Sequence, residues 1–347
     1  MAATLRDIAQ KSGLSISIVS RVLNKKTAKY RISKQTEKRV LQTAKDLNYR
    51  PNQLARGLRL RKTHTIGLVA PDISNPFFAS IIKTAEGVAH SLGYTLVVCD
   101  SDESSQLEVE HVGLLQAKGV DGLIVLPVGM KRSHLDAVIA GRVPLVTADR
   151  SFPDLRASSV VIDNHAGAME AIEHVVEHGH MRIAIIQGLR ETITSRERLR
   201  GYLDVLAAHD IPVDEGLIVG NDFRRETGYV ETLLLLRSRR PPTAIFTTSD
   251  LITLGALQAI FEQGLEVPRD ISVVAFDDIE SAEFFRCPIT AVSQPKESIG
   301  EIAVKLLTDH IRDQRGSYEI RSIVLKPTLI VRDSVASIQA PAESSIG

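Results

Sequence analysis

The chain has 347 residues, and its 42 basic and 42 acidic side chains give a formal charge of zero. The first 62 residues hold sixteen Lys and Arg against three Asp and Glu, while residues 63–347 hold the other 26 basic residues against 39 acidic ones. The first 62 residues, the head, therefore carry a net charge of +13, and the remaining residues, the body, carry −13. This segregation excludes an evenly mixed surface and indicates that the head binds a polyanion, DNA or RNA. Two cysteines, Cys99 and Cys287, are too few for a disulfide framework or a cysteine metal cluster.

The head begins with a pattern typical of two short helices joined by a turn. Thr4 and Asp7 fit a capping box for the first helix, which we expect to end at Gly13. Ser15 can cap a second helix from Ile16 to about Asn24. Its spacing turns Val19, Val22 and Leu23 inward, and the candidate DNA-reading residues on this helix are Ile16, Ser17, Ser20, Arg21 and Asn24.

A third helix is expected from Ser33 to Leu47, with a buried stripe of Val40, Leu41, Ala44 and Leu47. Three helices in this order predict a helix-turn-helix, whose second helix lies in the major groove of DNA. The remaining basic residues can meet phosphates, among them Lys25, Lys26, Lys29 and Lys34. A cationic bundle without a specific partner is the alternative, which the capping and turn signals disfavour.

A short basic segment follows the bundle. Residues 51–62 are too few and too basic for a stable free helix, and Gly57 lowers the helix propensity by roughly 1 kcal/mol relative to Ala. We therefore expect this segment to order only against DNA.

At this point the chain resembles the lactose-repressor (LacI/GalR) family of bacterial transcription regulators, and the resemblance runs to about Ser334. Its motifs are Thr4-Leu5-Arg6-Asp7-Ile8-Ala9, Gly13-Leu14-Ser15, Val19-Ser20-Arg21-Val22-Leu23-Asn24 and Asn48-Tyr49-Arg50-Pro51-Asn52. The resemblance implies that Arg21 contacts a base in the major groove. It also implies that the hinge helices of two subunits pair in the minor groove, where Leu58 is pushed between the central base pairs and Ala55 and Arg59 lie beside it. Ile18 stands where the family commonly has Thr, which removes a hydroxyl that could contact phosphate.

The body alternates strand-like and helical stretches, which predicts parallel sheets with helices on both faces. Helices are expected to end at Gly93, Gly119, Gly179 and Gly264. The strand-like runs begin at Ile66, Thr95, Gly122, Ile183, Ala244 and Ile271.

The fold class expected is therefore α/β: an N-terminal all-α helix-turn-helix domain joined to a core of doubly wound parallel sheets. The resemblance implies that this core is two-lobed and like a periplasmic binding protein, with crossings near Val161, Ser293 and Arg321. The expected boundaries are a DNA-binding domain at 1–50, a hinge at 51–62, a core at 63–334 and a flexible tail at 335–347. Lobe one would comprise about 63–161 and 293–321, and lobe two about 162–292 and 322–334.

Ligands of such folds bind at the carboxyl ends of strands, between the lobes. Polar or aromatic residues stand at several strand ends, including Phe77, Asp149 and Asp277. By resemblance, Arg198 and Asp277 match the effector-binding pair of the family. The full candidate set is Phe77, Phe78, Asp149, Arg150, Thr194, Arg198, Phe223, Ser249, Asp277 and Gln294. Core packing is the alternative for the aromatic rings, and a solvated surface or a salt link between lobes is the alternative for the charges.

Enzyme signatures are weak or missing. His174-Val175-Val176-Glu177-His178 has the spelling of one class of zinc peptidase, but Gly179 follows at once as a helix C-cap, which favours polar residues in a last turn. The sequence contains neither a Gly-x-Gly-x-x-Gly after a strand nor a phosphate-cradling Gly-Lys-Ser or Gly-Lys-Thr loop. We expect no enzyme activity, no metal and no cofactor.

The prediction is a ligand-responsive DNA-binding transcriptional regulator, a repressor of a carbohydrate-utilisation operon that binds a palindromic operator. The tail lacks heptads, so a homodimer is expected rather than a higher oligomer. The favoured effector is a pentose or hexose; a purine or nucleoside is the alternative, and Arg150 with Arg190 leaves room for an acidic sugar.

A solute-binding protein without a regulatory role is the alternative from another class of function. The cationic head and the lack of a signal peptide oppose it. The chain also lacks a run of eighteen apolar residues, so we expect it to be cytoplasmic and unattached to membranes.

Overall fold

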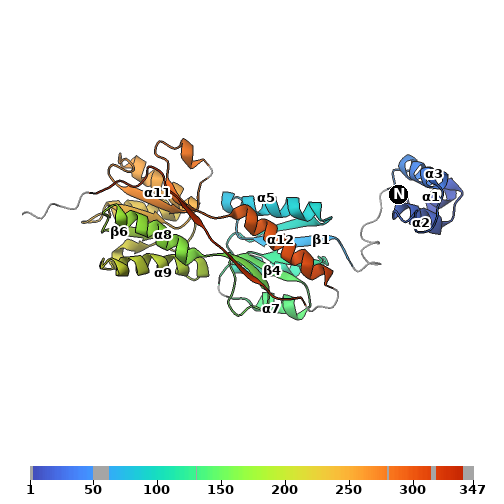
Figure 1. Cartoon of the computed structure of the whole chain (residues 1–347), viewed down its shortest axis with the longest axis horizontal. Coiled ribbons are helices and arrows are strands. Elements are labelled where there is room, and N and C mark those ends of the chain that lie inside the picture. The colour runs from blue at the N-terminus through green and yellow to red at the C-terminus, as the bar shows by residue number, and fades with distance from the viewer. Residues whose placement is uncertain (1–2, 50–61, 130, 280, 314–317, 339–347) are drawn as a thin grey trace, which may run out of the picture. The chain divides into compact units, whose positions relative to one another are not determined.

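The computed structural model describes residues 3–49, 62–129, 131–279, 281–313 and 318–338. The chain separates into two compact units, Met1–Thr63 and His64–Gly347, which we call the head and the body. Figure 1 shows the helices of the head and the sheets and helices of the body.

The head contains three helices, α1 (Leu5–Ser12), α2 (Ile16–Leu23) and α3 (Lys34–Asp46). The caps predicted for the first two helices are confirmed: Thr4 and Asp7 form a capping box, Gly13 ends α1 with a φ of 66°, and Ser15 accepts a hydrogen bond from the first turn of α2. Ser33, expected as the first residue of the third helix, is instead the N-cap of α3. The small core contains Ile8, Ala9, Val19, Val22, Val40 and Ala44.

The prediction that Leu41 belongs to the buried stripe of α3 is wrong, because its side chain is 49% exposed. One residue along an α-helix is a rotation of about 100°, so the position after the buried Val40 faces away from the core. The head therefore presents an apolar side chain on the outer face of α3.

Within the described residues the body contains two six-stranded sheets, and its doubly wound α/β class is confirmed. The first sheet has the order β11-β5-β4-β3-β1-β2 and is parallel throughout. Its strands are β1 (Thr65–Ala70), β2 (Thr95–Asp100), β3 (Gly122–Val125), β4 (Leu145–Asp149), β5 (Ser158–Ile162) and β11 (Ser322–Leu325).

The second sheet repeats this arrangement in the order β12-β10-β9-β8-β6-β7. Its strands are β6 (Ile183–Ile186), β7 (Ile218–Val219), β8 (Ala244–Thr247), β9 (Ser272–Phe276), β10 (Thr290–Ser293) and β12 (Thr328–Ile330). The edge strand β12 is antiparallel to β10, and the other pairs are parallel. We call the layers around the two sheets lobe one and lobe two.

Helices cover both faces of each sheet. In lobe one they are α5 (Pro76–Ser91), α6 (Ser105–Ala117), α7 (Ser133–Ala140) and α12 (Lys296–Arg312). In lobe two they are α8 (Asn164–Glu177), α9 (Ile193–Ala208), α10 (Arg225–Leu236) and α11 (Asp250–Glu262), with the short 3-10 turns η1 (Glu215–Leu217) and η2 (Ala282–Phe284). The four glycines expected at helix ends all have a left-handed φ, from 72° to 89°, which a side chain would disfavour.

None of the helices in the described ranges is long and apolar enough to cross a membrane.

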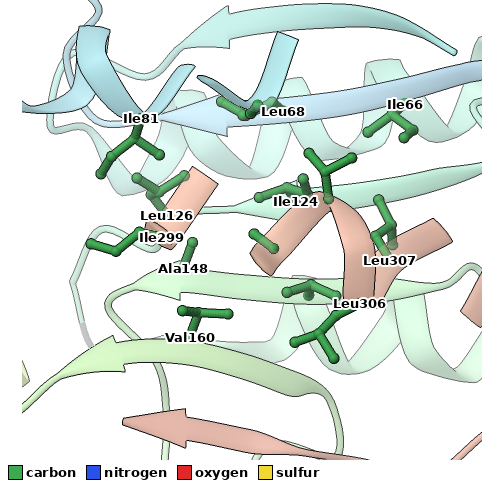
Figure 2. Close-up of a cluster of buried hydrophobic side chains, with 14 of the residues drawn as sticks. Ile66, Leu68, Ile81, Ile124, Leu126, Ala148, Val160, Ile299, Leu306 and Leu307 are labelled. Carbon is green, nitrogen blue, oxygen red and sulfur yellow. The ribbon is translucent and has the colours of Figure 1, made fainter. Parts of the chain in front are cut away.

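Apolar side chains between sheet and helices form the core of each lobe. In lobe one, Figure 2 shows Ile81 of α5 and Ile299 and Leu307 of α12 against the sheet residues Ile66 and Ile124. The helix α12 follows β10 of lobe two in the chain, so the chain returns to complete the core of lobe one. Separate clusters fill the opposite face of this sheet and the two faces of the second sheet.

The chain passes between the lobes after Ile162, after Ser293 and after Leu325. The third crossing was expected near Arg321, which is too early, because Ser322–Leu325 forms β11 and pairs with β5 in lobe one. The tail was expected to be flexible from residue 335, but Ile338 donates its backbone N–H to the carbonyl oxygen of His178 at 2.8 Å. Residues 335–338 therefore extend the structured part of lobe two.

Candidate functional site

A cleft lies between the two lobes and is lined by residues of both. All ten candidate effector residues line it, and the sequence analysis missed two further lining residues, Asn75 and Glu103. We call this cavity the effector cleft. Its lining residues are Asn75, Phe77, Phe78, Glu103, Asp149, Arg150, Thr194, Arg198, Phe223, Ser249, Asp277 and Gln294.

Two buried aspartates occupy equivalent places in the two lobes. Asp149 is the last residue of β4 and Asp277 directly follows β9, and these strands hold the same position in their sheets. Both residues have a left-handed backbone, with φ of 61° and 80°, which Asp tolerates better than most residues. Each lobe thus directs one carboxylate into the effector cleft from the carboxyl end of its sheet.

Arg198 extends from α9 and is held rigidly. Its Nε donates to Asn164 Oδ1 at 2.8 Å, and its Nη1 donates to the carbonyl oxygen of Thr248 at 2.6 Å. The guanidinium carbon lies 3.7 Å from the ring centre of Phe276, a cation–π contact. Burial lowers the pKa of Arg198, and the nearby Asp277 opposes that shift. Arg198 and Asp277, which the resemblance matched to the effector-binding pair, both line the cleft and are charged neighbours there.

Gln294 connects the cleft to a crossing segment. It lies between β10 and α12, and its amide nitrogen donates to Asp277 Oδ1. Its carbonyl oxygen Oε1 is buried without a hydrogen-bond partner. An unsatisfied buried acceptor is costly, and this residue lines the effector cleft.

Burial also shifts the acidic groups. It raises the pKa of Asp149 to about 6, although Arg150 and Arg198 lower it. It likewise raises the pKa of Asp277, against the charge of Arg198 and the hydrogen bond from Gln294. Groups with such shifts gather at functional sites, because desolvation and specific charges are arranged there.

A direct contact joins the lobes near the cleft. Asn75 caps α5 in lobe one, and its Nδ2 donates to Asp250 Oδ1 at the start of α11 in lobe two, at 3.3 Å. Burial raises the pKa of Asp250 to about 6, and Asp277 adds to that shift. The ends of these two helices therefore meet across the lobe interface.

Arg150 lies in lobe one between carboxylates and aromatic rings. Its two Nη atoms donate to the two carboxylate oxygens of Glu103, each at 2.9 Å, and its Nε lies 3.7 Å from Asp149 Oδ2. Its guanidinium carbon is 5.8 Å from the ring centre of Phe78 and 5.1 Å from that of Phe223. Burial by itself would lower the pKa of Arg150, but Glu103 and Asp149 raise it above its ordinary value.

The aromatic residues both line the cleft and pack. Phe77 and Phe78 are each 5% exposed, meet edge to face with ring centres 5.1 Å apart, and belong to the core of lobe one. Phe223 comes from lobe two and lies against Gly188, where an added Cβ would be 2.1 Å from its ring. Only glycine at position 188 leaves room for this ring, which forms part of the cleft wall.

The two missed residues carried signals of the kind that found the others. Glu103 lies shortly after the second strand, Asp149 is the last residue of the fourth, and Asn75 precedes Pro76 at a helix start. Attention to every strand end would have included both. No local pattern, however, indicates that Glu103 pairs with Arg150, 47 residues away.

The His-x-x-Glu-His motif, residues 174–178, lies at the end of α8. The rings of His174 and His178 are 4.4 Å apart, and His178 Nδ1 lies 2.7 Å from the carbonyl oxygen of His174. Among the residues that the structure describes, no group of three or more His, Cys, Asp or Glu side chains could hold a metal ion.

The reading helix α2 of the head presents a polar face. Ser17 and Arg21 are exposed, Ile16 is 45% exposed, and Ser20 and Asn24 are half-buried. The Arg21 guanidinium carbon lies 4.0 Å from the ring centre of Tyr30, a contact that the sequence analysis missed. Ile18 packs on the head core. The hinge candidates Ala55, Leu58 and Arg59 lie outside the described residues.

Two family models match the chain. Residues 4–52 match "Bacterial regulatory proteins, lacI family", and residues 172–335 match "Periplasmic binding protein-like domain". These matches cover the head and much of the body.

Curated relatives span nearly the whole chain. A Proteus mirabilis protein named HTH-type transcriptional repressor PurR is 36% identical over 338 residues, which are 96% of this chain and 97% of that one. A Haemophilus influenzae protein named ribose operon repressor is 34% identical over 337 residues, which are 97% of this chain and all of that one. A solved structure of the lac repressor dimer bound to operator and the anti-inducer ONPF is 28% identical, with a TM-score of 0.85 over 97% of this chain and 100% of that chain. The chain therefore belongs to the lacI family of bacterial regulatory proteins.

Proposed function

We propose that the chain is a ligand-responsive transcriptional repressor whose effector is a neutral sugar of pentose or hexose size. One observation carries the choice of ligand: each lobe contributes a buried carboxylate, Asp149 or Asp277, to the same small cleft. A sugar offers several adjacent hydroxyl groups, and each carboxylate can accept two or more hydrogen bonds from them.

The other cleft residues fit the same ligand. Arg198 donates in a fixed plane, and the unpaired Gln294 Oε1 accepts, so a hydroxyl group can satisfy both kinds of partner. Phe77 and Phe223 come from opposite lobes and supply apolar surface for the C–H faces of a sugar ring.

A purine corepressor is the second candidate, supported by the similarity to the Proteus mirabilis relative and by the aromatic walls of the cleft. A purine base has few N–H donors, so it would leave part of the capacity of Asp149 and Asp277 unused. This imbalance between donors and acceptors favours the sugar.

On the DNA side, the proposal is a homodimer that places two copies of α2 in successive major grooves of a palindromic operator. The basic hinge segment at 51–62, with Ala55, Leu58 and Arg59, would enter the minor groove between them. Such a regulator works where the chromosome is, in the cytoplasm.

Ligand and DNA would be coupled through the lobes. A ligand that contacts both Asp149 and Asp277 binds the closed arrangement better than an open one, and Gln294 lies on a crossing segment that must follow this motion. A coupling of about 1–3 kcal/mol is sufficient for a useful switch.

A thermal-shift screen of the full chain against D-ribose, other pentoses and hexoses, hypoxanthine and adenosine tests the ligand class. A ligand at a hundred times its dissociation constant adds about 2.7 kcal/mol of stability. The sugar proposal expects stabilisation by one sugar and an altered operator affinity in its presence. Stabilisation by a purine alone would replace the sugar with the second candidate.

A further inference from the structure

The only strongly basic group on the lobe-one wall of the described cleft is already paired. Both Nη atoms of Arg150 are bonded to Glu103, and Nη1 also lies 3.4 Å from the carbonyl oxygen of Pro127. Asp149 faces the remaining Nε at 3.7 Å. Two carboxylates therefore surround one guanidinium, and the side chain of Arg150 is only 6% exposed.

The backbone is distorted where it presents Glu103. Asp102 and Glu103 both have a left-handed φ, of 46° and 51°, a conformation that is uncommon for residues other than glycine and costs energy. Hydrogen bonds fix the turn: Asp102 N–H donates to Asp100 Oδ1 at 2.9 Å, and Glu103 N–H donates to the carbonyl oxygen of Pro71 at 2.8 Å. This turn places Glu103 in the lining of the cleft, where its carboxylate meets Arg150.

The charge balance of the cleft disfavours an anion. Three carboxylates line it, from Glu103, Asp149 and Asp277, against the two guanidinium groups of Arg150 and Arg198. Arg190, the other arginine considered for an acidic ligand, donates its Nε to the carbonyl oxygen of Gly220 at 3.0 Å and is not among the lining residues. A phosphate or carboxylate entering here would meet like charge and would find the Nη atoms of Arg150 occupied.

We propose that Glu103 determines the charge specificity of the effector cleft: by pairing with Arg150, it makes the cleft accept an uncharged sugar and reject the phosphate ester or acid of that sugar. This inference rests on the proposed function. The regulator then responds to the substrate of a sugar-phosphorylating reaction and not to its product, because phosphorylation adds the charge that the cleft rejects.

The test compares D-ribose with D-ribose 5-phosphate by isothermal titration on the full chain. The wild-type chain should bind the free sugar at least about tenfold more tightly than the phosphate, and Glu103→Gln should reduce that preference by about tenfold or more, because Arg150 is released to the anion. Glu110→Gln, which removes the same charge from the exposed face of α6, is the matched control and should leave the preference unchanged. Equal binding of both ligands by the wild type, or an unchanged preference in Glu103→Gln, overturns the proposal.

A second arm uses inorganic phosphate and does not depend on the sugar. Phosphate should raise the Tm of Glu103→Gln and of Glu103→Ala but not that of the wild type or Glu110→Gln, and adding Arg150→Gln should remove the gain. If neither ribose compound binds the wild type but this pattern is seen, ribose is not the effector, while the role of Glu103 stands. If phosphate affects all variants alike, the role of Glu103 is wrong, whichever ligand the cleft takes.

Discussion

At the end of β4, the carboxyl group of Asp149 is 4% exposed and has a pKa of about 6, because burial disfavours its charge. Charges around it come from Arg150, Arg198, Asp277 and Glu103. If the ionised carboxylate accepts hydrogen bonds from the effector, protonation removes its charge and converts one of its acceptor sites into an O–H donor. The protonation state of this one residue then controls effector affinity near neutral pH.

We expect effector affinity to be about tenfold weaker at pH 5 than at pH 7.5, because at pH 5 roughly one molecule in ten keeps a group of pKa 6 ionised. Isothermal titration across this range measures the change. Asp149→Asn should bind more weakly at pH 7.5 and should lose most of the pH dependence. The same pH profile in the variant and the wild type would assign the titration to another group, with Asp250 the next candidate.

The same carboxyl group affects stability with the opposite trend. Its pKa is raised in the folded state, from 3.8 to about 6, so the folded chain holds the proton more tightly than the unfolded chain does. Its contribution is fully present below pH 3.8 and is lost as the pH rises to about 6, a change on the order of 3 kcal/mol. Urea unfolding of the wild type and Asp149→Asn at pH 5 and 7.5 should show the variant gaining relative stability at the higher pH.

In the head, Arg21 is the side chain expected to read a base, and its guanidinium lies over the ring of Tyr30. Arg21→Ala should weaken operator binding by about 1–3 kcal/mol and leave binding to random DNA nearly unchanged. Lys34→Ala, which removes an exposed charge at the start of α3, should weaken both kinds of binding alike. Fluorescence anisotropy on operator and random duplexes separates these outcomes, and equal losses for Arg21→Ala would remove its reading role.

At the scale of elements, the turn after β9 sends two neighbouring aspartates in different directions. Asp277 lines the effector cleft, whereas Asp278 forms a bidentate ion pair with Arg332, at 2.7 and 3.2 Å. We therefore expect Asp277 to bind the effector and Asp278 to stabilise the fold.

Asp277→Asn should reduce effector affinity by tenfold or more while operator binding remains, because the loss of a charged acceptor costs about 1–3 kcal/mol. Arg198→Ala should act in the same way. Asp278→Asn is the matched control: it should lower the free energy of unfolding by about 1–3 kcal/mol and retain effector affinity. Titration with the effector beside urea unfolding gives both quantities. Retained affinity in Asp277→Asn would mean that the effector binds elsewhere.

For the whole molecule, the proposed function depends on a hinge at 51–62 that would couple DNA binding by the head to ligand binding by the body. Leu58 is expected to wedge between the central base pairs, and Leu58→Ala should keep the fold and the dimer but reduce operator affinity and DNA bending, because a methyl group cannot hold the step open. A circular-permutation gel assay measures the bend. Arg59→Ala is the companion variant, since it removes a charge and keeps the wedge; unaltered bending in Leu58→Ala would exclude the wedge.

Local signals determined most of the architecture in advance. The capping box of Thr4 and Asp7, the glycines at helix ends and the apolar strands each depend on neighbouring residues, so the sequence alone placed the head helices and the main strands. The shortest strands were less visible. β7 has two residues and β12 three, and a pattern so short has no periodicity to read. The four-residue strand β11 was not predicted either, which is why the last crossing was expected four residues too early.

In the candidate cleft, too, the sequence predicted which residues line the site but not how they contact one another. Strand ends and the family resemblance indicated ten of its residues, because the carboxyl ends of parallel strands meet at one edge of a sheet. The pairing of Arg150 with Glu103, the support of Arg198 by Asn164 and Thr248, and the unpaired oxygen of Gln294 were decided only by the tertiary structure. These contacts join residues that are 34 to 50 positions apart or depend on how two lobes close, and a hydrogen bond is fixed by distances of a few tenths of an ångström that no local pattern encodes.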